Sequence, residues 1–215
     1  MKVAFGMKAH SGWAAVVVVG KRDGNFVVVD RRRIELVEDE WAKQPYHAAE
    51  DLKPDAARDV VKRGVEAAHR IAVREMQAAV KRERERENDV TACAVLVANP
   101  MPDWSIEEIL TVHFRMHKAE GVLFRDALVG ATKACRLRLV AIPEKVLTKD
   151  AERALGTPPS GLMKKITTLG KSVGPPWGKD QKDAALAALV ALQGAEVRMN
   201  AVQQGVAADE RRRVG

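Results

Sequence analysis

Two aspartates near the C-terminus, Asp180 and Asp183, are the residues of this chain that are best placed to do chemistry. A Gly/Pro-rich loop at 174–178 precedes them, and an Ala/Leu-rich segment follows them. Because residues three apart are neighbours on the surface of a helix, the two carboxylates are expected to share a face. Such a pair can cap the start of a helix or hold a cation, and the pattern alone leaves both interpretations open.

Histidines are the other candidate ligands. His10 follows a strand-like segment, where it could carry a proton, ligate a metal or bond to the backbone of a turn. His113 and His117 are four apart and Glu120 follows three later, which is a possible zinc-ligand spacing if the segment is one continuous helix. Polar residues that face solvent explain the same pattern, and this interpretation is favoured. The remaining histidines, His47 and His69, belong to no recognisable pattern.

The composition is that of a globular protein with one core. The 215 residues are 47% hydrophobic and 30% charged, and no apolar run reaches the roughly 20 residues that a membrane span needs. The N-terminus reads as a strand without a secretory signal pattern. Cys93 and Cys135 stand in apolar contexts and are expected to be reduced thiols. We therefore predict a cytoplasmic location and no partnership with a membrane.

The chain is basic, with a net charge of +7. Aromatic residues make up only 4%, which argues against a single-strand binder that stacks bases. A basic chain of this kind can contact DNA or RNA, or simply have a basic surface. The candidate nucleic-acid-binding residues are Arg31, Arg32, Arg33, Lys164, Lys165 and the arginines at 211–213.

The first part of the chain predicts three antiparallel strands. Val3–Lys8 is a short strand, and Trp13–Val19 is a continuous β-branched run typical of a strand buried on both faces. Asp23 and Gly24 form a hairpin turn, after which Phe26–Val37 returns as a third strand.

The second part predicts alternating helices and strands. A long helix is expected over 55–87, and its last, charged turns should project into solvent or meet a partner, possibly a second copy of the chain. A strand over Val90–Ala98, a helix over Lys118–Ala134 and a strand over Arg136–Ile142 follow. Pro143 opens a short helix, and further helices complete the chain.

This order predicts an α/β fold with a mixed five-stranded sheet, three antiparallel strands followed by parallel ones, and helices on both faces. Residues 1–194 are expected to form a single domain, and 195–215 a mobile, basic C-terminal tail.

The order of elements, with two late carboxylates opening an Ala-rich last helix, resembles the ribonuclease H-like superfamily. It is most similar to the Holliday-junction resolvase (RuvC-type) branch, whose last helix begins Asp-x-x-Asp-Ala, as Asp180 to Ala184 do here. The resemblance implies a nuclease site in which four carboxylates hold two divalent cations. It also places a basic residue ahead of the last helix, and Lys165 is the nearest match.

Two of the four implied carboxylates are absent. Lys8 occupies the place of the aspartate on the first strand, and Asn99 stands where the fourth strand should end in a glutamate. If the alignment shifted by one residue, Met7 would take the place of Lys8. A lysine would repel the metal ions, so we predict a degenerate site in which Lys8 and Asp183 form an ion pair. His10 completes this set of vestigial-site candidates.

Three functional hypotheses follow. The first is a non-catalytic module on a ribonuclease H-like fold that binds nucleic acid or assists assembly and needs no cofactor. The second is a nuclease dependent on Mg²⁺ or Mn²⁺ that uses Asp180, Asp183 and a third ligand such as His10, Glu35 or Glu120. The third is a structural protein that self-associates through the long helix 55–87.

Overall fold

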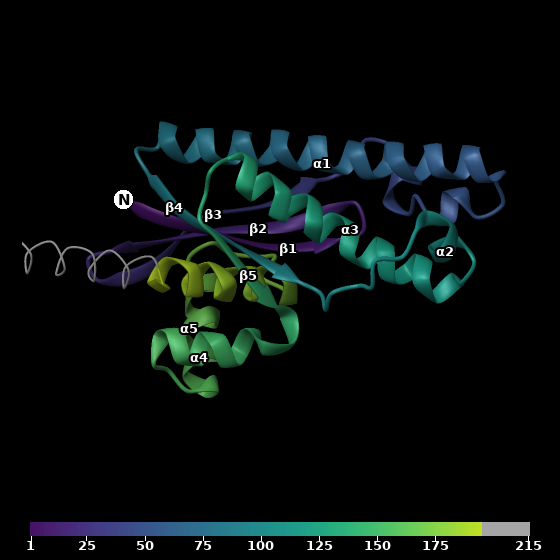
Figure 1. Ribbon diagram of the computed structural model, residues 1–215. Helices are drawn as coiled ribbons and strands as arrows, with labels where there is room; N and C mark the ends of the chain where they lie inside the picture. Colours follow the sequence, from purple (N-terminus) through teal and green to yellow (C-terminus); the bar gives the residue numbers. More distant parts are fainter. Residues whose placement is uncertain (195–215) are drawn as a thin grey trace, which may run out of the picture.

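The chain builds one five-stranded mixed sheet, as the sequence predicts (Figure 1). The computed structural model describes residues 1–194, so the predicted tail at 195–215 lies outside the described residues. The strand order is β3-β2-β1-β4-β5. β1 pairs antiparallel with β2 and parallel with β4, and β4 pairs parallel with β5. The strands are β1 (Lys2–His10), β2 (Trp13–Arg22), β3 (Asn25–Glu35), β4 (Asp89–Val97) and β5 (Leu139–Pro143).

The antiparallel meander follows from the turn and the valine run. Asp23 and Gly24 have φ values of 50° and 78°, the left-handed conformation that a tight hairpin turn requires. The valines of β2 are buried on both faces because helices cover both sides of the sheet.

The helices match the predicted order, with one boundary corrected. The α-helices are α1 (Pro54–Glu85), α2 (Ile106–Leu110), α3 (His113–Ala134), α4 (Leu147–Leu155) and α5 (Pro159–Lys171), and a last helix runs from 179 through the final described residues. Short 3₁₀ helices are η1 (Glu40–Lys43), η2 (His47–Ala49) and η3 (Glu144–Val146). The helix expected from Lys118 begins five residues earlier, at His113. None of the helices in residues 1–194 combines the length and apolar character needed to cross a membrane.

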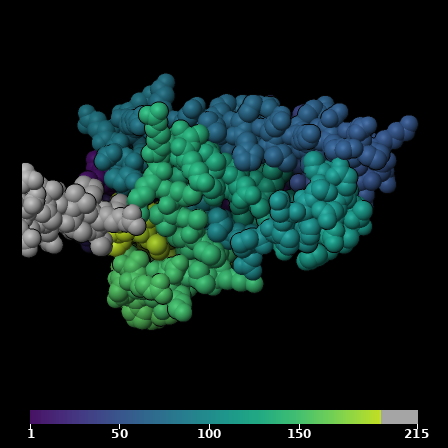
Figure 2. Space-filling view, in the orientation of Figure 1, coloured from purple at the N-terminus to yellow at the C-terminus, as the bar shows by residue number. Residues whose placement is uncertain are grey.

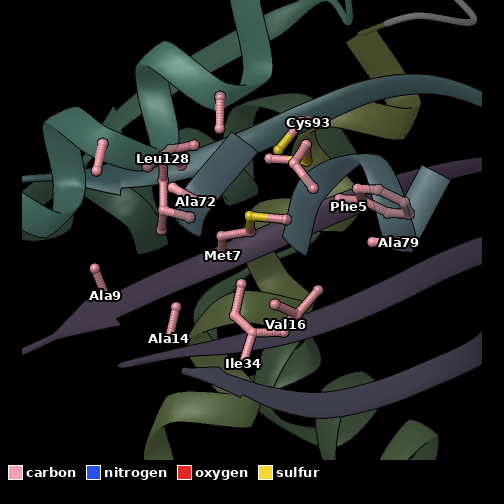
Figure 3. Packing of buried hydrophobic residues seen from close by; sticks show 14 of the residues in the cluster. Phe5, Met7, Ala9, Ala14, Val16, Ile34, Ala72, Ala79, Cys93 and Leu128 are labelled. Carbon is pink, nitrogen blue, oxygen red and sulfur yellow. The ribbon is translucent and has the colours of Figure 1, made fainter. Parts of the chain in front are cut away.

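Two helical layers sandwich the sheet. α1 and α3 cover one face, where Phe5, Met7 and Val16 share a core with Ala72 of α1 and Leu128 of α3 (Figure 3). α4, α5 and the last helix cover the opposite face (Figure 1). Successive residues of a strand point to opposite faces, so β1 alternates between the two cores.

The prediction that the last turns of α1 project from the body is wrong. Ala79 and Val80 pack in the main core, and the Glu83 side chain is 1% exposed because Arg86 and Asn88 donate hydrogen bonds to it. The helix instead extends past the sheet at its N-terminal half. There a third cluster that includes Tyr46, Val61, Ile109 and Met116 covers it. The space-filling view shows α2 and the start of α3 closing this end beneath α1 (Figure 2).

Candidate functional site

A tethered loop presents the two aspartates to the sheet. The indole of Trp177 packs against Gly170 of α5 and donates a 3.1 Å hydrogen bond from Nε1 to the carbonyl of Ile166. From β3, the Arg31 guanidinium donates to the carbonyl oxygens of Gly174 (2.8 Å) and of the two prolines that follow it. These contacts fix the loop that leads into the last helix.

The last helix begins without using the aspartates as caps. The backbone N–H of Gly178 donates to the side-chain oxygen of Gln181 at 3.0 Å, the reciprocal half of a capping box. Asp180 and Asp183 therefore remain available, and both turn toward β1. Of the two interpretations that the sequence left open, a simple cap does not describe this pair.

Lys8 meets both carboxylates. Its Nζ lies 2.6 Å from Asp183 Oδ2 and 3.3 Å from Asp180 Oδ1, and the residue is only 6% exposed. Met7, the residue that a shift of one position would put at the site, points into the opposite core with no exposed surface. The predicted ion pair between Lys8 and Asp183 is confirmed.

The ion pair is part of a longer network. Lys179 Nζ lies 2.5 Å from Asp183 Oδ2, so two ammonium groups share one carboxylate oxygen. On the other side, His10 Nε2 lies 3.1 Å from Asp180 Oδ1. The His10 ring stacks on Trp13 at 4.4 Å between centroids, and the Arg33 guanidinium covers that indole at 4.2 Å.

The charges of the network hold each other ionised. Burial alone would lower the pKa of Lys8, but its hydrogen bond to Asp183 and the charge of that carboxylate outweigh burial and raise the pKa. Burial would likewise raise the pKa of Asp180, but the neighbouring His10 and Lys8 lower it below its ordinary value.

The other predicted acidic and amide positions have partners other than Lys8, Asp180 and Asp183, or are exposed. Asn99 is exposed, two residues beyond the end of β4. Glu35 forms an exposed ion pair with Arg33 at 2.6 Å. Glu120 is buried and accepts from His47, although it also lines, with His10, a small cavity of about 190 Å³.

The candidate nucleic-acid-binding residues divide by environment. Arg31 holds the loop carbonyls, and Arg32 is paired with Asp30 at 2.7 Å. Arg33 is more than half exposed, although it is paired with Glu35. Lys164 and Lys165 line a groove between α5 and the β2–β3 turn, with Lys165 Nζ 5.5 Å from the centroid of the Phe26 ring.

The histidines on α3 do share a face, because α3 is continuous through this region. Their Nε2 atoms are 3.0 Å apart. The structure adds His47, whose ring centroid lies 4.6 Å from that of His117 and 5.0 Å from that of His113. The interpretation of His113 and His117 as separate solvent-facing residues is therefore incomplete, since a third histidine meets them.

Several residues of the network escaped the sequence analysis. The i,i+4 spacing of Lys179 and Asp183 could have revealed their pairing. No local pattern connects Trp13 with His10, Arg31 with the loop, or His47 with α3, because each contact joins distant parts of the chain or spans a turn.

The sheet itself decides the fold type. Its first three strands are antiparallel, its last two run parallel to the central strand, and helices cover both faces. The fold is ribonuclease H-like. The ion-pair network lies at the C-terminal end of the central strand β1, beside the start of the last helix.

Comparisons with known proteins find distant structural likenesses alone. Neither a protein-family model nor a curated protein matches the chain. Among solved structures the chain is similar to "Thermus thermophilus RuvC structure", with 14% identity and a TM-score of 0.46. It is also similar to "T. thermophilus RuvC in complex with Holliday junction substrate", with 15% identity and a TM-score of 0.48. Each match covers 92% of this chain and 96% of the other. A likeness at this level transfers neither residue roles nor function.

The carboxylates beside Lys8 are already paired with cationic groups. Asp180 and Asp183 are the carboxylates that meet Lys8, and each has an ammonium or imidazole nitrogen within 3.3 Å. Hard divalent cations bind through several oxygen ligands, most of them carboxylates. A metal ion at Asp183 would have to displace two ammonium groups.

Proposed function

We propose that this chain is a ribonuclease H-like module that binds nucleic acid and does not cleave it by the two-metal mechanism. One contact supports the proposal above all others: Lys8 Nζ stands 2.6 Å from Asp183 and 3.3 Å from Asp180. A two-metal nuclease would gather cations between such carboxylates to activate water and to stabilise the leaving oxygen. Here the ammonium group neutralises the carboxylates that the metal ions would need.

The ion-pair network also gives the site a structural role. It joins β1 to the last helix through charges that are mostly shielded from water. Breaking such a pair leaves an uncompensated charge and destabilises a fold. The network can in this way hold the shape of the site.

We propose that the protein binds nucleic acid because it has a net positive charge and an exposed lysine beside a groove. The chain carries a net charge of +7, and Lys164 is an exposed cation beside an open groove. Lysine and arginine contacts to phosphates supply most of the affinity for nucleic acid that is independent of sequence.

A substitution at Lys8 tests the central claim. Lys8→Asp removes the cation and adds a third carboxylate, so we expect Mn²⁺ to bind at least about tenfold more tightly than to the unmodified protein. Calorimetric titration measures this change. Lys164→Asp makes the same change of charge on α5, away from the site, and should leave Mn²⁺ affinity unaltered.

Cleavage assays test whether the protein is a nuclease, which would contradict the proposal. Four-way junctions and linear duplexes are the appropriate substrates, because the resolvase resemblance implies branched DNA. The unmodified protein should cleave neither with Mg²⁺ or Mn²⁺. Manganese-dependent cleavage that disappears in Asp183→Ala would show instead that the site is catalytic.

The second candidate function, a metal-dependent nuclease with an unusual ligand, rests on His10. Its Nε2 lies 3.1 Å from Asp180 Oδ1, close enough for both to approach one cation. In that case cleavage should be lost in both His10→Ala and Asp180→Ala. The position of Lys8 disfavours this alternative.

A further inference from the structure

Three histidines from two segments converge at the end of the molecule beyond the sheet. His113 and His117 occupy neighbouring turns of α3, and His47 approaches them from η2. One ring nitrogen from each lies within 4.8 Å of the others, and within the described residues this is the group of three that meets the condition for a shared metal ion. Two of the nitrogens are already 3.0 Å apart, close to the roughly 3.3 Å that separates ligands in a tetrahedral zinc site with bonds of about 2.0–2.1 Å.

Glu120 orients one of the three rings. Its side chain is 3% exposed, and its Oε2 lies 2.7 Å from His47 Nδ1 while its Oε1 accepts from the His47 backbone N–H at 3.1 Å. When Nδ1 donates to a carboxylate, Nε2 of the same ring carries a free lone pair. Metal-ligating histidines almost always have such an outer partner.

The remaining nitrogen of His47 has no other use in the described structure. His47 Nε2 is buried and lacks a hydrogen-bond partner among the described residues. A hydrogen bond between the Nε2 atoms of His113 and His117 would account for that pair, but it would leave His47 Nε2 unsatisfied. A buried polar atom without a partner is costly, and a metal ion coordinated by all three rings would satisfy it.

We propose that His47, His113 and His117 form a binding site for a divalent transition metal, of which Zn²⁺ is the best match. Neutral imidazoles suit Zn²⁺, and three protein ligands leave a fourth position for water. The buried carboxylate of Glu120 and the Glu50 carboxylate, 3.9 Å from His113 Nδ1, supply compensating negative charge. This site is distinct from the Lys8 network and does not depend on its function.

The metal ion would join two parts of the chain that lie far apart in sequence. η2 lies in the segment between the meander and α1, and α3 follows much later in sequence. Both pack on the third cluster under the N-terminal half of α1. Bound metal is therefore expected to stabilise this end of the molecule.

The test uses the full chain after removal of metal with a chelator. Titration with Zn²⁺ by calorimetry, and with Co²⁺ by absorption spectroscopy, should show one site per chain with a tetrahedral Co²⁺ spectrum. His113→Ala and His117→Ala remove exposed ligands and should each abolish this site. Glu120→Gln keeps the shape but not the charge, and should weaken binding about 10–100-fold.

His69 lies outside both sites and serves as the matched control. His69→Ala should bind Zn²⁺ as the unmodified protein does. Zn²⁺ should raise the melting temperature of the unmodified protein but not of the His113→Ala, His117→Ala double variant. Without metal, the double variant should have the same melting temperature as the parent, since the side chains of His113 and His117 are exposed.

Three results would overturn the proposal. They are absence of stoichiometric binding to the unmodified protein, undiminished binding in the double variant, and loss of the site in Asp183→Asn. The last result would locate the metal ion at the carboxylates of the ribonuclease H-like site instead. These results are independent of the Mn²⁺ titration of Lys8→Asp, so each proposal can be contradicted without affecting the other.

Discussion

At the scale of single residues, Lys8 sets the charge beside Asp180 and Asp183. A carboxylate at this position would add to the charge of Asp180 and Asp183 and attract cations. The ammonium instead cancels that charge within 3.3 Å of both. Lys179 adds a second cation on Asp183, so the carboxylates are neutralised without a metal ion.

The free energy of unfolding, measured at decreasing pH, tests whether Asp180 is ion-paired in the folded protein. Its pKa is lowered in the folded protein, so its contribution to stability is present above the unfolded value near 3.8 and is lost as pH falls through the folded value. Asp180→Asn should therefore reduce the free energy of unfolding by about 1 kcal/mol at neutral pH. The difference from the parent should shrink toward zero as the pH falls through the lowered pKa of Asp180 in the folded protein.

Urea denaturation at a series of pH values measures this difference. Asp103→Asn alters an exposed loop aspartate and is the matched control, with little effect at any pH. An Asp180→Asn variant whose deficit is the same at pH 7 and at low pH would contradict the assigned ion pairing.

At the scale of elements, the close approach of the last helix to β1 sets the geometry of the site. Gly6 allows this approach, because a Cβ atom there would overlap the backbone carbonyl of Ala184. Lys8 lies two residues after Gly6, on the same face of β1. On the last helix, Asp183 directly precedes Ala184, whose carbonyl faces Gly6. The contact at Gly6 thus brings the lysine and the aspartates together.

Substitution of Gly6 should destabilise the protein strongly. Gly6→Ala forces the last helix away from β1 and is expected to destabilise the protein by at least about 3 kcal/mol, since backbone atoms cannot move aside as side chains do. Gly121→Ala is the control. A Cβ atom added at Gly121 would have Arg125 Nη1, at 3.8 Å, as its nearest neighbour.

The control substitution should change the free energy of unfolding in the opposite direction. Alanine replaces glycine inside α3 without a clash, so Gly121→Ala should stabilise the protein by about 0.5–1 kcal/mol. Thermal and urea unfolding of the two variants would measure both effects. A Gly6→Ala protein as stable as its parent would show that the last helix does not approach β1 as described.

At the scale of the whole molecule, the sheet separates two kinds of surface. α5 carries Lys164 and Lys165 on one side, and α1 carries the charged run that ends at Glu85 on the other (Figure 1). Phosphate binding is proposed for the first side. Self-association through α1 remains a prediction for the second.

Salt dependence should distinguish the two sides. Replacing both Lys164 and Lys165 with Glu should weaken DNA binding and reduce the slope of log affinity against log salt by about 1–2. Replacing Lys81 and Arg84 with Glu reverses the same number of charges on α1 and should have a smaller effect. Fluorescence anisotropy at several salt concentrations measures both.

The α1 variant answers a second question. Sedimentation of this variant and its parent reports whether the charged end of α1 mediates self-association. Equal loss of DNA affinity in the two double variants would indicate that binding follows net charge alone, without a preferred face.

The sequence by itself determined the sheet and the pairing of Lys8 with Asp183. Strands and helices follow from local periodicity and turn residues, and the order of elements restricts the sheet to few topologies. Lys8 and Asp183 could be paired in advance because the resemblance specifies which strand meets the last helix. The start of α3 was placed too late because its first turn, from His113, contains too few apolar residues to show the helical period.

Only the tertiary structure brought together the residues that no local pattern connects. Arg31 holds the loop at 174–176, and His47 joins His113 and His117 under the orienting carboxylate of Glu120. Partners of this kind are separated by 66 or more positions in sequence. Their meeting depends on how η2 and α3 pack beneath α1 and how the last helix packs on β1, which is decided by the shape of the cores. Sequence periodicity describes each element separately and carries no information about such distances.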